Sequence, residues 1–408
     1  MKDKQIDIKS NRIKFITHGF FYSAGIGIAE PSTVLPVIVN YFSSSNVLIG
    51  LFSSLLRGGA VFMQLYAAFY AQSYKRVLPK LNIIFIFRFL TWFSIGLSIY
   101  FFGQNYHTLT LWLFGIGLFL FSFSAGFGTV YFSELMGKSF SNEYRGKTLA
   151  YRQFFSGVSA IASGALSAWF LKNFDKPMSF AILFFVSAFV MSLGYLSVAL
   201  VKEFPKEKVS EKEKNFGEFL KNTVKTLKSD NLLKYQIITR LITYSYLFVF
   251  PFVGIKAIKQ FDLDMSFAGI FAFLLMSGAM LSNIIWAKLS GKSKNTLIVK
   301  ISFVLMILAM LIVLFAQNYI VYSLVFVIAG AAADGFKISF MNLIFNISPA
   351  EKRPVYIAIQ NNLTSLGMFF SIPGGALLSL LGYNILTSLI IILMLTGLYL
   401  SFNLKENR

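Results

Sequence analysis

Long apolar stretches separated by short polar segments run along the whole chain. At a rise of about 1.5 Å per residue, a helix of each stretch can cross a bilayer core of roughly 30 Å. The pattern therefore predicts an all-α membrane protein with twelve transmembrane helices. The expected spans are 15–42, 47–71, 81–102, 108–136, 148–171, 177–200, 235–258, 265–290, 296–317, 319–347, 355–379 and 382–403.

One longer hydrophilic segment divides six spans from six. It holds KEFPKEKVSEKEK, which is typical of a solvated linker, followed by NFGEFLKNTVKTLKSD, whose apolar spacing predicts an amphipathic helix on the inner membrane surface. The lysines of that helix are interpreted either as lipid contacts or as an ordinary solvated face. The predicted organisation is an N-terminal six-helix half over 1–200, a cytoplasmic linker over 201–234 and a C-terminal six-helix half over 235–408.

The two halves repeat each other. An alignment without gaps sets the segment from Gly50 over the segment from Gly269, and a second match sets NEYRGKTLAYRQ over AEKRPVYIAIQN. Pro31 in the first span also has a counterpart, Pro251, in the seventh. These matches follow the same order in both halves, so they indicate duplication. Two pseudo-symmetric halves are typical of a transporter whose site lies between them, near the membrane midplane.

Composition and charge agree with a membrane protein. Only 13% of residues are charged, against roughly 25% in soluble domains. The net charge of +20 does not indicate nucleic acid, because Lys and Arg gather in alternate loops while the turns SSSN and GQNYHT hold none. This distribution predicts a multi-pass protein of a bacterial cytoplasmic (inner) membrane with both termini cytoplasmic. The polar N-terminus and long first span do not fit a cleavable signal peptide.

Several kinds of chemistry find no support in the sequence. The absence of cysteine excludes disulfides, thiolate metal sites and thiol nucleophiles. The two histidines, His18 and His107, are too far apart along the chain to form a metal motif. No GxxxxGK[ST] loop and no catalytic constellation occurs. We therefore expect neither an enzyme nor a cofactor, and an ion gradient as the energy source.

The loops after the second and eighth spans carry a family resemblance. Ala287–Lys294 and Ala68–Arg76 look like the signature of the major facilitator superfamily, a small residue and Leu followed by an acid and basic residues. Gln72 and Gly291 replace the usual Asp, and the proline-glycine motif of antiporters is missing from the fifth span. Thr239–Phe252 looks like the seventh span of a little-characterised bacterial branch. The chain resembles this superfamily over essentially its whole length, which implies a transporter.

The first span contains an acid near its middle, Glu30, directly before Pro31. A carboxylate at membrane depth costs on the order of 2.5 kcal/mol or more unless it is paired, protonated or hydrated. Pro31 predicts a bend or break of the helix at this point. Arg57 lies at similar depth in the second span, so a Glu30–Arg57 ion pair is expected. We interpret Glu30 and Arg57 as substrate- or proton-coupling groups, with a permanent structural salt bridge between them as the alternative.

Asp334 and Lys337 form a second charged pair, in the tenth span. They are three residues apart and so share one helix face, where they can pair locally. A self-neutralised pair that only tolerates burial is the alternative to a coupling role. With one acid and one base from each half, the cavity is expected to be nearly neutral and to suit a zwitterion or a polar organic solute.

Further polar side chains are candidates for the cavity wall. They are Gln64, Tyr244, Tyr246, Asn283 and Asn361. Gln64 and Asn283 occupy matched repeat positions, and Asn361 belongs to an amide cluster at 360–362. Buried amides need partners, which neighbouring helices supply as readily as a substrate does.

Four arginines are candidates for a cytoplasmic gate. Arg88 and Arg240 lie shallow enough to snorkel to the interface, so anchoring and inner-gate salt bridging are both open. Arg145 and Arg353, together with Arg152, fall in the repeated cytoplasmic loops. There they are expected to bind helix C-termini or loop acids when the inner side closes, unless they serve topology alone.

We predict a secondary active transporter that moves a small organic solute by alternating access and is coupled to protons. Its partners are the solute, protons and the lipid bilayer, and a monomer is expected. One alternative is a drug–proton antiporter that exports amphipathic compounds, which the 47 Phe residues favour. Another is a transport-inactive membrane sensor or accessory protein, because Gln72 and Gly291 replace the signature acids.

Overall fold

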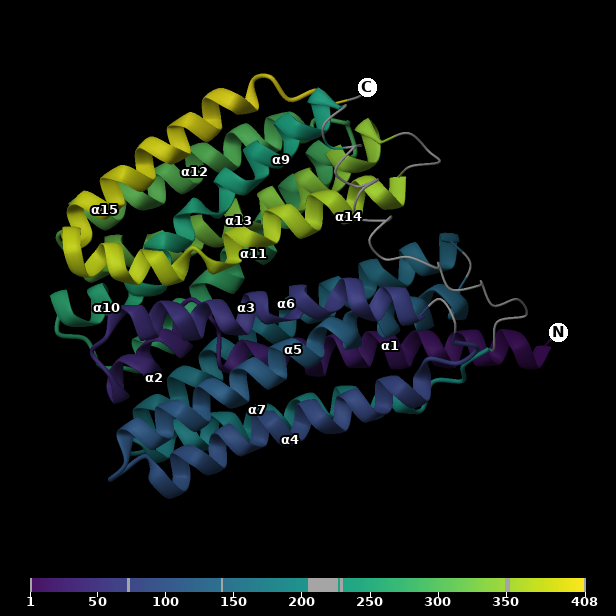
Figure 1. Ribbon diagram of the computed structural model, residues 1–408, viewed down its shortest axis with the longest axis horizontal. Coiled ribbons are helices and arrows are strands. Elements are labelled where there is room, and N and C mark those ends of the chain that lie inside the picture. The colour runs from purple at the N-terminus through teal and green to yellow at the C-terminus, as the bar shows by residue number, and fades with distance from the viewer. Residues whose placement is uncertain are drawn as a thin grey trace. The chain divides into compact units, whose positions relative to one another are not determined.

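The structure is a computed structural model, and the residues that it describes are helical apart from short turns (Figure 1). It describes residues 2–71, 74–140, 142–204, 227, 230–348 and 353–406. This described part contains no strand, and nine of its helices are long and apolar enough to cross a membrane. The predicted class, an all-α multi-pass membrane protein, is confirmed. The count of twelve spans and the layout in two halves stay predictions.

The helices group into two compact units. Unit 1 consists of Met1–Ser43, Leu55–Lys214 and Ala268–Phe273, and unit 2 of Ser44–Ser54, Asn215–Phe267 and Leu274–Arg408. Most of the predicted linker and amphipathic helix, as well as Gln72, lies outside the described residues. The domain boundaries drawn from the sequence therefore stay predictions.

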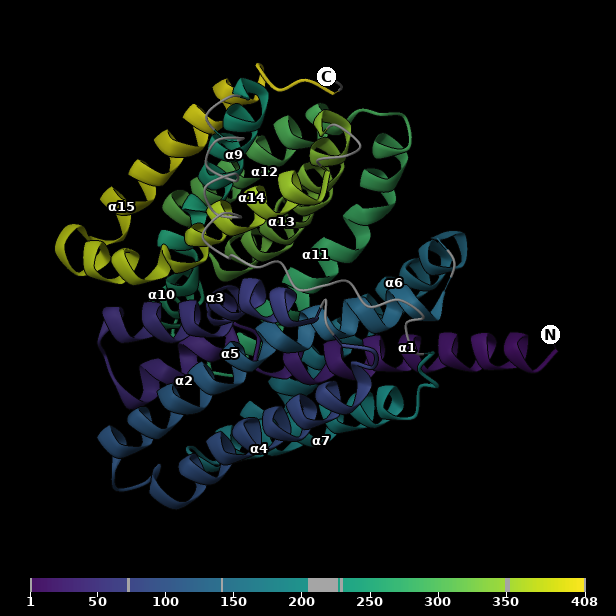
Figure 2. The same ribbon diagram turned by 45° about the vertical axis from the view of Figure 1, so that its right-hand side comes forward.

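Seven helices make up most of unit 1. They are α1 (Lys2–Ile28), α2 (Val34–Phe42), α3 (Asn46–Ala71), α4 (Leu78–Phe102), α5 (His107–Ser139), α6 (Asn142–Asn173) and α7 (Met178–Ala199). Helix α1 packs along α6 and α7, and α4 packs along α5 and α7 (Figure 2). Small residues allow close packing, since Ser187 on α7 donates to the Gly25 carbonyl on α1 and accepts from Trp92 on α4, both at 2.7 Å.

Unit 2 contains shorter and more interrupted elements. They are α9 (Asn231–Thr243), the 3-10 turn η1 (Tyr244–Phe248), α10 (Phe250–Gln260), α11 (Phe267–Ser290), α12 (Asn295–Phe315), α13 (Tyr319–Ile347), α14 (Arg353–Thr364), the 3-10 turn η3 (Ser365–Phe369) and α15 (Ser371–Ser401). Within α15 the chain turns at Gly382, whose φ of 73° is in the left-handed region that glycine tolerates. Helix α12 packs along α13 and α15.

Prolines mark the interrupted helices. Helix α1 ends at Ile28 and α2 begins at Val34, so the break predicted beside Pro31 is confirmed. Its repeat counterpart Pro251 lies in the first turn of α10, directly after η1. A third interruption, η3, precedes Pro373 in α15. A proline has no N–H to donate, so each helix restarts where that loss matters least.

Two helices begin earlier than the hydropathy pattern predicted. Helix α1 begins at Lys2 rather than at 15, and α6 begins at Asn142 rather than at 148. Hydropathy marks only the apolar part of a helix, and polar residues extend it beyond that part. On α1 this extension is fixed by contacts to the end of α7, where Lys14 Nζ donates to the Leu200 carbonyl at 2.6 Å.

Each unit ties the start of an internal helix to the chain that follows its last helix. In unit 1 the buried Glu203 carboxylate accepts from the N–H groups of Val77 and Leu78, at 2.7 and 3.0 Å, where α4 begins. Lys138 on α5 forms an ion pair with the same carboxylate at 3.2 Å. The carboxylate accepts hydrogen bonds from N–H groups that have no partner within the helix, and its negative charge stabilises the positive end of the helix dipole.

Unit 2 repeats this arrangement with Glu406. Its carboxylate accepts from the N–H and the hydroxyl of Thr296, and from the Asn295 amide at 3.2 Å, where α12 begins. No basic side chain forms an ion pair with Glu406 among the described residues. The two glutamates thus cap corresponding helices, although neither was singled out by the sequence repeat.

The aligned glycines Gly50 and Gly269 also share a structural role. A Cβ on Gly50 would lie 1.9 Å from the Ser371 carbonyl oxygen, within unit 2. A Cβ on Gly269 would lie 2.2 Å from the Ala168 nitrogen, within unit 1. Both positions therefore require glycine for close helix packing.

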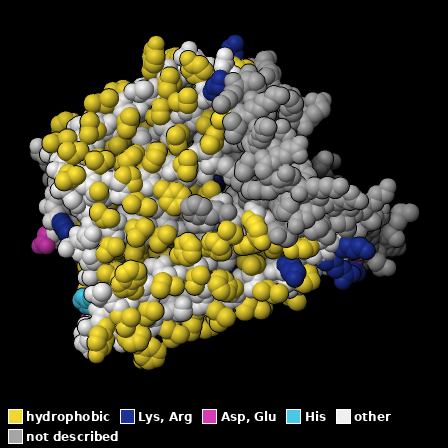
Figure 3. Space-filling model, viewed as in Figure 1, with side chains coloured by type: hydrophobic (Ala, Val, Ile, Leu, Met, Phe, Trp, Pro, Cys, Tyr) yellow, Lys and Arg dark blue, Asp and Glu magenta, His cyan; other side chains and the backbone are white. Residues whose placement is uncertain are grey.

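Apolar side chains predominate over the part of the surface in Figure 3 that is coloured by residue type. Large hydrophobic residues are widely exposed in both units, for example Trp112 at 70%, Ile284 at 74% and Leu380 at 80%. Such a surface suits contact with lipid rather than with water.

Candidate functional site

The break in the first span is built around Glu30, which is only 4% exposed. Its carbonyl accepts from the N–H groups of Val34 and Leu35 at 3.1 and 3.0 Å, so the donors at the start of α2 are satisfied. Its carboxylate accepts from the Ser32 N–H at 2.7 Å and from the Thr33 hydroxyl at 2.9 Å. Glu30 therefore stabilises the break locally, a contribution that the sequence interpretation did not include.

Arg57, the partner predicted for Glu30, lies on α3 within unit 1. Its side chain falls outside the described residues, as does that of Arg353. The Glu30–Arg57 ion pair and a gate role for Arg353 stay predictions.

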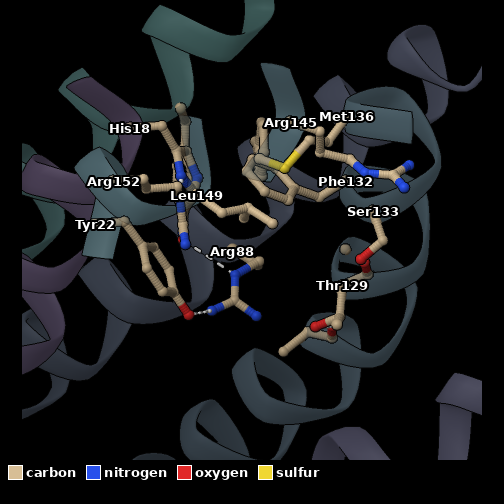
Figure 4. A pocket seen from close by; sticks show the side chains of 14 residues that line it. His18, Tyr22, Arg88, Thr129, Phe132, Ser133, Met136, Arg145, Leu149 and Arg152 are labelled. Carbon is tan, nitrogen blue, oxygen red and sulfur yellow. Dashed lines mark hydrogen bonds between the residues drawn. The ribbon is translucent and has the colours of Figure 1, made fainter. Parts of the chain in front are cut away.

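Five helices of unit 1 enclose a cavity of about 510 Å³ (Figure 4). Its wall combines basic, hydroxyl-bearing and aromatic side chains. The lining residues are His18 and Tyr22 of α1, Phe85 and Arg88 of α4, Ala125, Gly128, Thr129, Phe132, Ser133 and Met136 of α5, Arg145, Leu149 and Arg152 of α6, and Tyr195 of α7. A volume of this size is typical of small-molecule sites.

Arg88 is fixed deep in this wall, with 3% of its side chain exposed. Its Nε donates to the Tyr195 hydroxyl at 3.0 Å, its Nη1 to the Phe121 carbonyl at 3.0 Å and its Nη2 to the Tyr22 hydroxyl at 3.1 Å. Its Cζ lies 3.9 Å from the centroid of the Phe121 ring. This burial does not fit the predicted interfacial anchoring, because the protein interior supplies the acceptors that snorkelling would seek. A gate role for Arg88 stays a prediction.

Arg152 and His18 lie beside each other in the same wall. Arg152 Nη2 is 3.5 Å from His18 Nδ1, a long contact, and Arg152 Nε is buried without a hydrogen-bond partner. The guanidinium lies over the Phe132 ring, 5.1 Å from its centroid, while the His18 ring stacks on Tyr22 at 5.4 Å. Arg152 thus belongs to helix α6 and to the cavity rather than to a cytoplasmic loop.

Only part of this cavity was predicted from the sequence. Arg88 and Arg145 were singled out, but as gate residues, and His18 was considered only as a metal ligand. Tyr22 and Tyr195 were missed altogether. A usable signal was present, since His18 and Tyr22 are one helical turn apart and lie on the same face of the first span.

Unit 2 holds a smaller cavity of about 200 Å³, between α9, η1 and α13. Tyr244 and Tyr246, predicted to line a cavity, are both in its wall, and so are Arg240 and Lys337. Arg240 Nη1 donates to the Asn361 amide oxygen at 3.2 Å. Arg240 therefore has an amide partner here.

Asp334 and Lys337 are both described, and no ion pair joins their side chains. The Asp334 Oδ2 and Asn283 Oδ1 atoms are buried without hydrogen-bond partners. The local pairing expected from their three-residue spacing is therefore absent, because Lys337 is exposed to the cavity while Asp334 is partly buried. Gln64 lies on α3 and does not line either cavity described above.

The amide cluster at 360–362 divides between two roles. Gln360 is 1% exposed and accepts from the Gln236 amide at 2.7 Å, while its own amide donates to the Phe340 carbonyl at 3.3 Å. These contacts satisfy Gln360 within unit 2. Asn361 is exposed and its amide oxygen accepts from Arg240, so Asn361 is open to a solute, while Asn362 is half-buried.

Among the described residues, no three His, Cys, Asp or Glu side chains lie together in a way that could hold a metal ion.

Comparison with known protein families decides the class. The family model described as "Major Facilitator Superfamily" matches residues 15–372. The chain belongs to the Major Facilitator Superfamily. No curated protein sequence matches this MFS protein. The resemblance found in its signature loops is thereby confirmed, and the protein is a membrane transporter rather than an enzyme.

Solved transporter structures share the fold of this MFS protein. A variant of the nucleoside transporter NupG superposes with a TM-score of 0.76 at 12% identity, over 97% of this chain and 99% of that one. A D-xylose–proton symporter gives 0.69 at 12% identity, over 95% and 96%. The human organic anion transporter MFSD10 (TETRAN) gives 0.68 at 12% identity, over 97% and 99%. At this identity the likeness establishes the fold alone.

Proposed function

We propose that this MFS protein is a secondary active transporter that moves a small organic solute by alternating access, driven by protons. The observation that carries the proposal is the unit 1 cavity of about 510 Å³, whose wall holds buried ionisable groups from three helices, His18 of α1, Arg88 of α4 and Tyr195 of α7. Ionisable residues inside membrane helices are expensive and mark solute or proton pathways. The names of its structural neighbours, a nucleoside transporter and a D-xylose–proton symporter, agree with this class of solute.

Glu30 is the proposed proton-coupling group, with Arg57 as its exchange partner. Glu30 is buried at a helix break, and interrupted helices are where transporters of this kind build their sites. Asp334 of unit 2 is a second candidate, since its Oδ2 is buried without a hydrogen-bond acceptor or donor opposite it.

The remaining site assignments complete the proposal. Tyr244, Tyr246, Asn361 and Lys337 contact the solute from unit 2, and Arg145 and Arg240 contribute to closing the inner side. The protein works as a monomer in a bacterial inner membrane, with both termini in the cytoplasm.

The test is solute flux in proteoliposomes with an imposed pH gradient. Glu30→Gln is expected to abolish gradient-driven accumulation while solute exchange at equal pH on both sides continues, because the amide keeps hydrogen bonding but carries no proton. Glu30→Asp, which retains the titratable group, is the matched control and should keep some gradient-driven flux.

Unchanged proton-driven flux in Glu30→Gln would remove Glu30 from the coupling role. If no solute in a panel of sugars, nucleosides, amino acids and carboxylates moves under any gradient in the native protein, the transporter proposal itself is overturned.

A further inference from the structure

The unit 1 cavity carries an excess of positive charge. Three arginines and one histidine are among its lining residues, while none of the described residues that line it is Asp or Glu. Arg88 and Arg152 are both described, and neither forms an ion pair with a carboxylate. Two guanidinium groups thus line this cavity without an anionic partner among the residues that the structure describes.

Such an arrangement is costly for the empty site. Burying a charge without an opposite charge costs several kcal/mol, and arginine stays protonated under all conditions relevant to proteins. The hydroxyls of Tyr22 and Tyr195 and the Phe121 carbonyl solvate Arg88 only as dipoles. An anion in the cavity would compensate the positive charge of Arg88, which these neutral dipoles do not balance.

Unused donors are available to bind it. A guanidinium offers five N–H donors, and Arg88 uses three of them within the protein. Arg152 makes a single long contact, at 3.5 Å to His18 Nδ1, and its Nε has no partner. His18 lies within electrostatic range of both guanidinium groups. In Figure 4 the labelled side chains of Arg88, Arg152 and His18 lie together on one side of the cavity.

The rest of the wall suits an organic body. Phe132 lies against His18 and Arg152, with its ring centroid 4.8 Å from that of His18, and Phe85, Met136 and Leu149 add further apolar surface to the wall. A cavity of about 510 Å³ has room for a small metabolite in addition to one charged group. An inorganic ion alone would leave this apolar surface unused.

We infer that the solute is a small organic anion whose carboxylate or phosphate is bound by Arg88 and Arg152. This inference rests on the proposed transport function and specifies its substrate class. It replaces the zwitterion or polar organic solute expected from the sequence, because no acid that would balance these arginines is among the described residues that line the unit 1 cavity. Arginine forks match both carboxylate and phosphate oxygens, so the chemistry shared by the two classes defines the site.

The test measures binding to the full-length protein in nanodiscs, in chloride-free buffer, by thermal shift and calorimetry. Two matched pairs of probes are used, benzoate with benzamide and glycerol 3-phosphate with glycerol. The comparison within each pair measures the effect of the anionic group, and the comparison between the pairs distinguishes a carboxylate from a phosphate. Binding of at least one anion, at least 10-fold tighter than its neutral partner, is expected, since hydrogen bonds from a guanidinium to a charged acceptor are stronger than those to a neutral one.

Variants at Arg152 assign the site, because this side chain has few contacts that folding depends on. Arg152→Gln should weaken anion binding about 10- to 100-fold. Arg152→Lys should recover part of it, since the charge remains but the fork is lost. Lys172→Gln removes one positive charge from an exposed position on the same helix α6 and is expected to bind the anion as the native protein does.

Equal binding of anion and neutral partner, no binding of either anion, or anion binding that Arg152→Gln and Lys172→Gln weaken equally would each overturn the inference. Flux distinguishes the two proposals. If a pH gradient drives only a neutral solute and Arg152→Gln does not change that flux, the proposed transport function is supported and the inference of an anionic solute is wrong. If anion binding depends on Arg152 but no solute is transported, the anion-binding site is supported and the proposed transport function is overturned.

Discussion

The cavities of the two units differ in charge, size and construction. The unit 1 cavity is about 510 Å³ and lies between long helices that run through without interruption at its wall, such as α5 and α6. The unit 2 cavity is about 200 Å³ and has the 3-10 turn η1 in its wall. The buried Arg88 and the half-buried Arg152 dominate the first, whereas Arg240 in the second donates to a protein amide. The two cavities therefore differ in their chemistry.

Backbone features show the opposite behaviour. The aligned glycines Gly50 and Gly269 both allow a close helix approach, and Glu203 and Glu406 both cap a helix start. Residues that bind free backbone N–H groups or allow helices to approach closely meet the same physical requirement in each unit, because an unsatisfied N–H or a steric clash is costly anywhere in a membrane helix. The side chains that line a cavity are not subject to this backbone requirement. Divergence is expected there first.

The largest expected effect comes from adding a methyl group at the close approaches. Gly50→Ala and Gly269→Ala would each place Cβ within 2.2 Å of backbone atoms, so we expect each to lower the unfolding free energy by about 3 kcal/mol. The measurement is thermal and denaturant unfolding in detergent. Gly128→Ala is the control, because its Cβ would meet only a side-chain atom at 3.5 Å. A tolerated Gly269→Ala beside a damaging Gly50→Ala would show that the two approaches are not equivalent.

The helix caps should differ in strength. Glu203→Gln removes an ion pair with Lys138 as well as the charge at the start of α4, so a loss of about 2 kcal/mol is expected. Glu406→Gln removes only the charge at the start of α12, for which about 1 kcal/mol is expected. The same unfolding measurement compares them. Equal losses would mean that Lys138 adds nothing to the cap.

The smallest effect concerns tyrosine hydroxyls. Tyr195→Phe takes one acceptor from the buried Arg88 guanidinium and is expected to lower the unfolding free energy by about 1 kcal/mol. The Tyr244 hydroxyl makes no hydrogen bond with the described residues, so Tyr244→Phe should change stability by less than about 0.5 kcal/mol. If Tyr195→Phe is equally neutral, Arg88 is solvated by other groups.

Hydropathy and proline placement predicted the fold class and the helix breaks, because both depend on local properties of the chain. The break at Pro31 and the restart at Pro251 follow from the missing N–H alone. The cap by Glu203 was out of reach, since it joins residues 126 positions apart along the chain.

The unit 1 cavity shows the same limit. Arg88, His18 and Arg152 are visible in the sequence as isolated polar residues, each with an ordinary interpretation. What brings them together is the packing of α1 along α6 and of α4 along α7, which no local pattern reports. The distance of Arg88 from the nearest loop indicates its position along the span, but it does not indicate that the side chain is buried among neighbouring helices.

Glu30 joins two helices with a single residue. Its carbonyl accepts from the start of α2, and its carboxylate accepts from Ser32 and Thr33 in the break itself. The angle between α1 and α2 is therefore linked to the rotamer of one side chain. A change of that rotamer, whatever its cause, withdraws two hydrogen bonds from the break and changes how the first span bends.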